Sequence, residues 1–489
     1  MIQPLALPPP PGPVHFVGIG GAGMIGLARL LLADGYRVSG SDRADTPALA
    51  ALRAGGATVY VGHDAAQVGD AALVIITAAV NTANPEVAAA LARGIPVVKR
   101  AALLGLLANT RRLIAVAGTA GKSTTSGMVA FALSRLGLDP WYAVGAEVRD
   151  LGTSAFAGAG GAGGVGVVEA DEYDYSFLHL APRVAVVTNM EYDHPDLFPN
   201  EATYRDAFAQ FAARVVPDGL LITNADDPAC EELAQSHERN GGRVERVGRA
   251  EHADWRIVVS RGVVLVWHGG AMIGPLAPGQ PGEHNLYNAA MAAAACAAVG
   301  ADAAATVRVL SAYGGVGRRF ELLGEAGGVA VIDDYAHHPT KVRATLAAAR
   351  ARYPHRRVVA VLQPHTYSRT ALFVREFGAA LGGADVALVT DIYAAREANP
   401  GTVAAEDVVS HIPTGRGRAS GDLAATLDVL RGVAKPGDVV LVMGAGDVTV
   451  VGPRLLAALR EGAGETDDPV QGGALSPPIQ RSNPVEGGL

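Results

Sequence analysis

The stretch Leu113-Ile-Ala-Val-Ala-Gly-Thr-Ala-Gly-Lys-Ser-Thr-Thr125 decides the central part of the fold. Its apolar start predicts a buried strand, and the lysine and hydroxyl residues that follow predict the start of a helix. Gly118 and Gly121 allow a tight turn whose N–H groups point inward, and a helix N-terminus adds positive charge there. Lys122 supplies a point charge, and the Ser123 hydroxyl could ligate Mg²⁺. The sequence therefore predicts a phosphate-binding loop, with ATP as its ligand.

This loop departs from the strict Walker pattern, because Val116 stands where that pattern has its first glycine. The alternative is an ordinary turn between a strand and a helix. Apolar residues follow at helical spacing, at Met128, Phe131 and Leu136, and two glycines suit the close approach of an anion. Both features favour phosphate binding.

A second glycine loop lies near the N-terminus, at Gly18-Ile-Gly-Gly-Ala-Gly23, between a predicted strand at 14–19 and a predicted helix at 24–33. It matches the G-x-G-x-x-G spacing, and Asp42 follows where an acid that binds a ribose would stand. Alone, this pattern indicates a dinucleotide dehydrogenase. The same loop can hold any pyrophosphate, such as that of a UDP-sugar, and it can also be a structural turn.

Bulk composition points to a globular protein with small-molecule partners. The chain has 489 residues, 49% hydrophobic and 18% charged, with a net charge of −8, so we expect about three domains and no nucleic-acid partner. Cys230 and Cys296 are too few for a disulfide framework. The first residues do not resemble a signal peptide, and the apolar segments are too short to span a membrane. We expect a cytoplasmic protein without membrane contact.

Strands that alternate with helices predict an α/β fold with parallel sheets. The expected domains are 1–110, 111–314 and 315–460, followed by a disordered tail at 461–489. The glycine-rich stretch 152–166 predicts a surface loop.

Polar clusters follow two predicted strands of the middle domain, at Glu169–Asp174 and Asn189–His194. The carboxyl ends of parallel strands share one edge with the phosphate loop, so Glu169 and His194 could converge on the ion that Ser123 holds. The alternative is a pair of solvated loops.

Three polar residues open a predicted alanine-rich helix. His284, Asn285 and Asn288 lie within about one helical turn, so their side chains could point together at a base or a phosphate. A helix N-cap by Asn285 is an equal alternative.

The last domain again places polar runs at strand ends, at Asp333–Pro339 and Gln363–Arg369, after the boundary run Gly317-Arg-Arg-Phe320. Such runs predict a cleft with acid, base and cationic groups. His337 and His338 are a poor zinc pair, because adjacent histidines point apart.

Taken together these motifs resemble the Mur ligase family along the chain from about Val14 to Leu459. The resemblance rests on the following runs: His15-Phe-Val-Gly-Ile-Gly-Gly-Ala-Gly-Met24, Ser39-Gly-Ser-Asp42, Ala117-Gly-Thr-Ala-Gly-Lys-Ser123, Glu169-Ala-Asp-Glu172, His284-Asn285 with Asn288, Gly317-Arg-Arg-Phe320, Asp333-Asp-Tyr-Ala-His-His-Pro339, and Gln363-Pro-His365 with Tyr367-Ser-Arg369.

The resemblance implies a Rossmann-like N-terminal domain that binds a UDP-sugar, a central P-loop ATPase-like domain and a Rossmann-like C-terminal domain that binds an amino acid. It implies a ligase of peptidoglycan precursor synthesis that uses ATP and Mg²⁺ to join L-alanine to the lactyl carboxylate of UDP-N-acetylmuramate through an acyl phosphate. Attachment of a murein tripeptide to the same sugar is the alternative within the family. An NAD-dependent oxidoreductase is a remoter alternative. We expect a monomer or homodimer.

The family's functional residues map onto this chain in four groups. The resemblance implies catalytic roles for Lys122, Glu169, His194, Arg319, Asp334, His338 and His365. It implies contacts with ATP by Gly118, Thr119, Ala120, Gly121, Lys122, Ser123, Thr124, His284, Asn285, Asn288 and Arg319. It implies contacts with the other substrates by Gly18, Gly20, Gly21, Gly23, Met24, Asp42, His365 and Arg369. It implies that Mg²⁺ is held by Ser123, Glu169 and His194.

The chain departs from the family's usual residues at three positions. Ala120 stands where the family usually has His, and Ser123 replaces the commoner Thr while keeping the hydroxyl. Thr366 stands where an Arg is usual, so one substrate contact is missing from the expected set.

Overall fold

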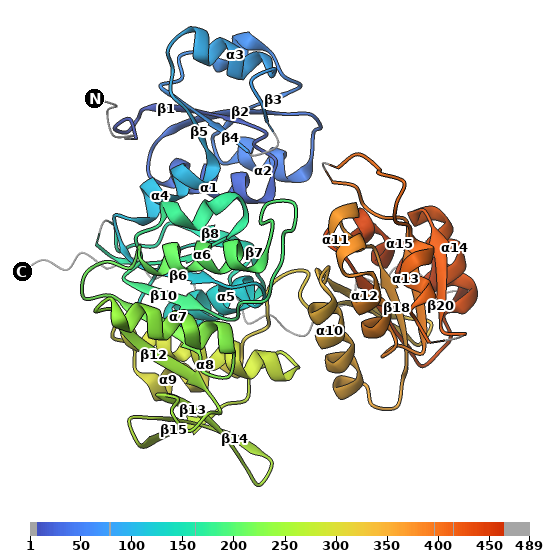
Figure 1. The fold of residues 1–489 in the computed structure, drawn as a ribbon. Coiled ribbons are helices and arrows are strands. Elements are labelled where there is room, and N and C mark those ends of the chain that lie inside the picture. The colour runs from blue at the N-terminus through green and yellow to red at the C-terminus, as the bar shows by residue number, and fades with distance from the viewer. Residues whose placement is uncertain (1–6, 78–79, 162, 396, 414, 464–489) are drawn as a thin grey trace, which may run out of the picture.

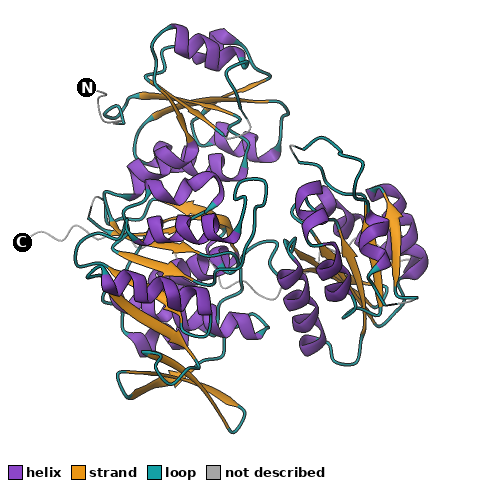
Figure 2. Cartoon of the chain, viewed as in Figure 1, coloured by secondary structure: helices purple, strands orange, loops and turns teal. Residues whose placement is uncertain are grey.

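Three separate sheets organise the chain in a computed structural model that describes residues 7–77, 80–161, 163–395, 397–413 and 415–463. They have five, ten and six strands, and Figures 1 and 2 show the five-stranded sheet at one end of the ten-stranded one, with the six-stranded sheet to one side. Helices cover the sheet faces. The predicted α/β class, with mainly parallel sheets, is confirmed.

The N-terminal sheet is parallel, with the strand order β3-β2-β1-β4-β5. Side chains of β1 alternate between two layers: Val14 and Phe16 join the core that contains α1, and Val17 packs with Val87 of α3. The elements are β1 (Pro13–Val17), α1 (Ala22–Ala33), β2 (Arg37–Asp42), α2 (Pro47–Ala54), β3 (Thr58–Val61), η1 (Ala65–Val68), β4 (Leu73–Ile76), α3 (Pro85–Ala92), β5 (Val97–Lys99) and α4 (Arg100–Ala108).

The middle sheet has β6 (Arg112–Ala117) near its centre, between β10 (Val184–Val187) and β9 (Val165–Glu169), both parallel to it. All of β6 after Arg112 is buried, which explains its unbroken apolar sequence. The other elements are α5 (Lys122–Arg135), β7 (Trp141–Val148), η2 (Arg149–Leu151), β8 (Thr153–Phe156), η3 (Tyr173–His179), α6 (Glu201–Ala212), β11 (Leu220–Asn224), α7 (Pro228–Arg239), β12 (Arg243–Gly248), β13 (Trp255–Ser260), β14 (Val263–His268), β15 (Ala271–Pro275), α8 (Glu283–Ala298) and α9 (Ala303–Leu310).

The glycine-rich stretch 152–166 is not the single surface loop that its composition predicts. Residues Thr153–Phe156 form β8, which pairs antiparallel with β7. Ala155 of β8 is buried and packs toward Gly26 of α1, so this strand ties the middle domain to the N-terminal one.

The C-terminal sheet has the order β16-β17-β21-β18-β19-β20, parallel except for β16. Strands β17 and β21 are buried along their whole length. The elements are β16 (Glu321–Ala326), β17 (Val329–Asp334), α10 (Pro339–Arg352), β18 (Arg357–Leu362), α11 (Tyr367–Leu372), α12 (Val374–Leu381), β19 (Val386–Thr390), α13 (Ala405–Ser410), β20 (Gly417–Gly421), α14 (Leu423–Val433), β21 (Asp438–Met443), η4 (Asp447–Val450) and α15 (Val451–Ala463).

The C-terminal end differs slightly from the prediction. Helix α15 runs to Ala463, so residues 461–463 of the predicted tail are helical, and the rest of that tail lies outside the described residues. Among the described helices, we find none that combines the length and the apolar character needed to cross a membrane.

Candidate active site

The phosphate loop joins the buried end of β6 to the first residue of α5. Gly118 and Gly121 have φ of +130° and +86°, values that residues with a side chain rarely adopt. A Cβ atom on Gly118 would overlap Thr188, and one on Gly121 would lie 2.6 Å from Asn288 Oδ1. Both positions therefore need glycine for conformation and for space.

Residues that follow β10, the strand next to β6, hold the phosphate loop in place. Asn189 Oδ1 accepts a hydrogen bond from the Ala120 N–H, and Asn189 Nδ2 donates to the Ala120 carbonyl, both at 2.9 Å. Thr119 Oγ1 donates to the Glu191 carbonyl and lies 2.8 Å from the Tyr204 hydroxyl. The shape of the loop is thus fixed through the backbone of Ala120.

Lys122 is paired with a buried acid. Its Nζ donates to Glu172 Oε2 at 2.7 Å and to the Gly118 carbonyl at 2.8 Å. Burial alone would lower the pKa of Lys122, but Glu172 and the nearby Asp171 and Glu169 carboxylates outweigh it and raise the pKa above its usual value. Burial likewise opposes ionisation of Glu172, yet Lys122 and a nearby histidine lower the pKa of Glu172 to about 2. Lys122 is therefore kept as a cation.

A cavity of about 2120 Å³ lies against this loop and reaches all three domains. It is lined by residues of the phosphate loop, by Gly23 of the N-terminal domain, and by several strand-end residues of the C-terminal domain. The sequence-predicted residues that line it are Gly23, Thr119, Ala120, Gly121, Lys122, Ser123, Thr124, Glu169, His194, His284, Asn285, Asn288, Arg319, Asp334, His365 and Arg369.

The three residues expected to hold Mg²⁺ all face this cavity. Ser123 is in the first turn of α5, and Glu169 ends β9 with its Oε2 accepting the Gly145 N–H at 2.7 Å. His194 has φ of +57°, and its Nε2 lies 3.6 Å from Glu172 Oε1.

The polar residues of α8 lie within the helix rather than before it. The N-cap is Gly282, so the alternative prediction of an N-cap at Asn285 is wrong. Asn285 instead donates through Nδ2 to the Pro281 carbonyl, and Asn288 donates to Asn285 Oδ1 at 3.0 Å. Burial lowers the pKa of His284, which favours its neutral form.

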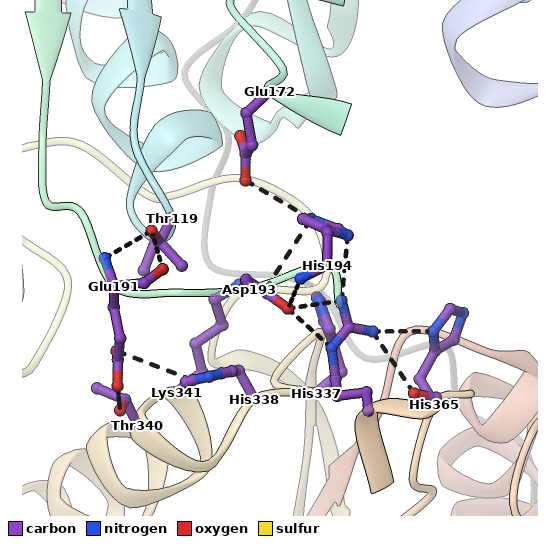
Figure 3. Close-up of polar contacts among 12 residues, drawn as sticks. Thr119, Glu172, Glu191, Asp193, His194, His337, His338, Thr340, Lys341 and His365 are labelled. Atoms are coloured by element: carbon purple, nitrogen blue, oxygen red, sulfur yellow. Dashed lines mark hydrogen bonds and ion pairs between the residues drawn. The ribbon is translucent and has the colours of Figure 1, made fainter. Parts of the chain in front are cut away.

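A buried ion pair joins the middle and C-terminal domains. Arg369 donates through Nε and Nη2 to Asp193 Oδ1, at 2.9 and 2.7 Å, and Arg369 Nη2 lies 3.2 Å from His194 Nδ1. Figure 3 labels Asp193, His194 and His365 at this contact. The exposed fractions of the Arg369 and Asp193 side chains are 3% and 1%. Burial would raise the pKa of Asp193, but the charges around it hold that pKa well below its usual value.

His365 extends this contact within the C-terminal domain. Its Nδ1 lies 3.3 Å from Arg369 Nη1, and its ring stacks on Tyr393. Burial and the neighbouring Arg369 charge lower the pKa of His365 to about 4, so its ring is neutral near pH 7.

Arg319 and Asp334 flank the opposite part of the C-terminal wall. The Arg319 guanidinium lies over the Tyr335 ring, 4.9 Å from its centroid. The Asp334 oxygens accept the backbone N–H groups of Phe320 and Ala336, and burial raises the pKa of Asp334. Asp334 thus fixes the turn that carries Arg319.

The structure places His337, rather than the predicted His338, on the cavity wall. Consecutive residues point in different directions, and the His338 ring packs edge-on against Phe373. His338 Nδ1 lies 3.8 Å from Glu191 Oε2, which places it at the domain contact.

The N-terminal glycine loop is held by its own acid. Asp42 Oδ2 accepts the Gly20 N–H at 2.7 Å, so Asp42 shapes the loop. Met24 differs from the expectation of a substrate contact: its side chain is buried in the core, and its N–H donates to the Gly21 carbonyl. Gly18 takes the positive φ that the tight turn needs, and Gly23 is the member of this loop that reaches the cavity.

Besides His337, four residues at this site were missed by the sequence interpretation: Glu172, Glu191, Asp193 and Lys341. The first three lie in the acidic runs that we placed at strand ends, but the pattern gave no way to decide which acid pairs with which cation. Lys341 is in the first turn of α10, directly after the polar run of the third domain, and nothing local marks it as functional.

Comparison with known families covers most of the chain. Residues 13–112 match the family "Mur ligase family, catalytic domain", residues 116–296 match "Mur ligase middle domain", and residues 318–446 match "Mur ligase, glutamate ligase domain".

Comparison with individual proteins gives the same result. The UDP-N-acetylmuramate–L-alanine ligase of Saccharopolyspora erythraea is 44% identical over 93% of this chain and 95% of its own length. The ligase of the same name from Mycobacterium marinum is 44% identical over 96% of this chain and 99% of its own length. The crystal structure of the corresponding ligase from Thermotoga maritima superposes with a TM-score of 0.76 at 29% identity, over 92% of this chain and 99% of that one. The crystal structure of a murein peptide ligase from Psychrobacter arcticus superposes with a TM-score of 0.69 at 25% identity, over 92% of this chain and 98% of that one. With three matched domains and this level of identity, the chain belongs to the Mur ligase family.

Proposed function

We propose that this chain is an ATP-dependent ligase that joins L-alanine to the lactyl carboxylate of UDP-N-acetylmuramate and releases ADP and phosphate, in peptidoglycan synthesis. The observation that carries the proposal is the single cavity that Lys122, Gly23 and Arg369 line from three different domains. The relatives named for this reaction align with more than nine-tenths of the chain, which supports the choice of substrates.

The reaction has two steps. A lactyl carboxylate oxygen attacks the γ-phosphorus of ATP, which gives an acyl phosphate and ADP. The amine of L-alanine then attacks the acyl carbon, and a tetrahedral intermediate expels phosphate. Neither step needs a covalent bond to the protein, so the residues act by positioning and by offsetting negative charge.

Lys122 would bind the terminal phosphate, since it is kept charged at the base of the loop. Arg319 lines the same cavity from the C-terminal domain and would offset charge on the transferring group. His284, Asn285 and Asn288 would contact the nucleotide, and His365 and Arg369 would meet the other substrates. Closure of the C-terminal domain onto the middle one would complete this set.

The residues at the loop fit a magnesium ion that binds together with ATP. A Ser123 hydroxyl oxygen and a Glu169 carboxylate suit this hard cation, with His194 as a third neighbour. Within the described part of the chain, no group of three or more His, Cys, Asp or Glu side chains could hold a metal ion. Phosphate oxygens and water would therefore supply the remaining ligands, and the bound ion would neutralise phosphate charge.

The test is phosphate release from ATP by the purified protein. We expect release only when UDP-N-acetylmuramate and L-alanine are both present. Release with a murein tripeptide in place of L-alanine would instead support the alternative ligase, and reduction of NAD would support an oxidoreductase. A cytoplasmic location and a monomeric or homodimeric state stay predictions.

Lys122→Ala tests the phosphate loop itself. We expect turnover to fall by more than about 100-fold, because a charge aimed at the reacting phosphate is lost, while the UDP-sugar still binds to the N-terminal domain. Calorimetric titration measures that binding. Lys435→Ala, at an exposed lysine of the C-terminal domain, is the control. Turnover retained in Lys122→Ala would contradict the assignment of the loop.

A further inference from the structure

Lys341 is a largely buried lysine at the point where the C-terminal domain meets the middle one. It lies in the first turn of α10, whose N-cap is His338, and its side chain is 15% exposed. Its neighbour Thr340 donates a hydrogen bond to Glu191 of the middle domain, which fixes the start of α10 against the edge that carries the phosphate loop. Figure 3 shows Lys341 beside this contact.

The ammonium group of Lys341 has only a loose partner. Its Nζ lies 3.8 Å from Asp193 Oδ2, which is beyond hydrogen-bonding distance. Asp193 Oδ1 already accepts two hydrogen bonds from Arg369, and Oδ2 is buried without a hydrogen-bond partner among the described residues. Asp193 is thus chiefly the partner of Arg369, and the charge of Lys341 is available to another group.

Lys341 faces the same cavity as two other cations, Lys122 and Arg319. Burial and the positive charges of these two residues lower the pKa of Lys341 to about 8, although Asp193 and Glu172 act in the opposite direction. Like charges brought together in a low-dielectric site are unfavourable until an anion enters between them. Glu172 already offsets the charge of Lys122, so the charge of Lys341 is the one that an anion entering the cavity would still offset.

We propose that Lys341 is a further catalytic residue of the ligase: a cation supplied by the C-terminal domain to the phosphoryl group during its transfer from ATP. The inference rests on the proposed function. In that step a carboxylate oxygen forms a bond to the γ-phosphorus, the bond to the β-phosphate oxygen breaks, and ADP leaves with the electron pair. No proton moves, and Lys341 offsets the charge on the transferring group opposite Lys122.

This role couples the chemistry to domain closure. Lys341 belongs to α10, which contacts the middle domain at Glu191 and Asp193. An open domain arrangement would leave Lys122 with ATP but withdraw Lys341. The acyl phosphate would then form only after the C-terminal domain has closed, which protects it from water.

Hydroxylamine trapping of the acyl phosphate tests the proposal, because the trapped hydroxamate reports the first step without L-alanine. We expect Lys341→Met to lower hydroxamate formation and complete turnover by the same factor, about 100-fold, with less than a few-fold change in affinity for a non-hydrolysable ATP analogue. Lys341→Arg keeps the charge and should recover at least about a tenth of the wild-type rate. Lys435→Met is the matched control at an exposed lysine of the same domain.

Three results would overturn the proposal. Normal hydroxamate formation with slow reaction of L-alanine would place Lys341 at the amine instead. Equal losses in the Met and Arg variants, or loss of the closed domain arrangement in solution, would make its role structural. A thermal melt of both variants checks folding. Absence of hydroxamate with the wild-type protein would refute the proposed function itself, so the two failures are distinguishable.

Discussion

The ion pair between Asp193 and Arg369 predicts a specific defect in domain closure. Asp193→Asn keeps the shape of the side chain but removes its charge. Both side chains are buried, and removal of one partner of a buried ion pair costs about 3–5 kcal/mol. Because the partners belong to different domains, both can be hydrated when the domains separate. The cost therefore falls on the closed arrangement alone.

The size of the effect follows from the two hydrogen bonds. Arg369 donates twice to the same Asp193 oxygen, and Asn still offers a neutral acceptor there, so we take the lower value of about 3 kcal/mol. At 1.36 kcal/mol for each tenfold change, the ratio of closed to open molecules should fall about 150-fold. Turnover should fall in proportion wherever closure limits it.

Single-molecule energy transfer between the two domains measures this ratio. Both native cysteines, Cys230 and Cys296, are buried, so labels can be directed to new cysteines at exposed Gln210 of α6 and Arg431 of α14. Asp206→Asn, at an exposed carboxylate of the middle domain, is the control. An unchanged distance distribution in Asp193→Asn would refute the reasoning, because the pair would then contribute nothing to closure.

Two further predictions concern the N-terminal domain and the acid that ends β9. Glu86 is buried and accepts from Ser41, with His15 Nε2 at 2.6 Å. Burial would raise the pKa of Glu86, but these contacts lower it below its usual value. The ionised carboxylate therefore stabilises the fold above the unfolded pKa of about 4.3, and this stabilisation is lost as the pH falls through the pKa of the folded state. Urea unfolding should show Glu86→Gln less stable at pH 7 but close to wild type at low pH, and a constant difference would contradict this. Gly145→Ala should displace the Glu169 carboxylate, because the new Cβ would overlap it. The Mg²⁺ concentration needed for half-maximal turnover should rise about 10-fold at an unchanged melting temperature, and an unchanged requirement would remove Glu169 from the ion's ligands.

Local sequence patterns were enough to predict the two glycine loops and the strands that precede them. An apolar run, then glycine, then a residue that opens a helix describes one continuous piece of backbone, so the sequence contains all the information that the geometry uses. The same reasoning placed polar runs at the carboxyl ends of strands, and residues of those runs from Glu169 to Arg369 do line one cavity. The roles of the individual residues stay predictions.

Sequence reasoning stopped where a contact depends on two segments that no local pattern relates. β8 was missed because its pairing with β7 and its packing on α1 override a glycine-rich composition. Within the polar run of the third domain, the resemblance pointed to His338, but the structure places the His337 ring on the cavity wall and makes His338 the N-cap of α10.

The ion pairs of the active site show why its charge distribution could not be predicted from the sequence. Lys122 could have paired with Glu169 or Asp171 as well as with Glu172, and Arg369 could have faced solvent or substrate instead of Asp193. The first choice depends on the path of the backbone after β9, within the middle domain, and the second depends on how the middle and C-terminal domains meet. No short segment encodes either. The loose pairing of Lys341 is therefore a property of the assembled cavity. Asp193→Asn and Lys341→Met should differ accordingly, because the first changes how often the domains meet and the second changes what happens once they have met.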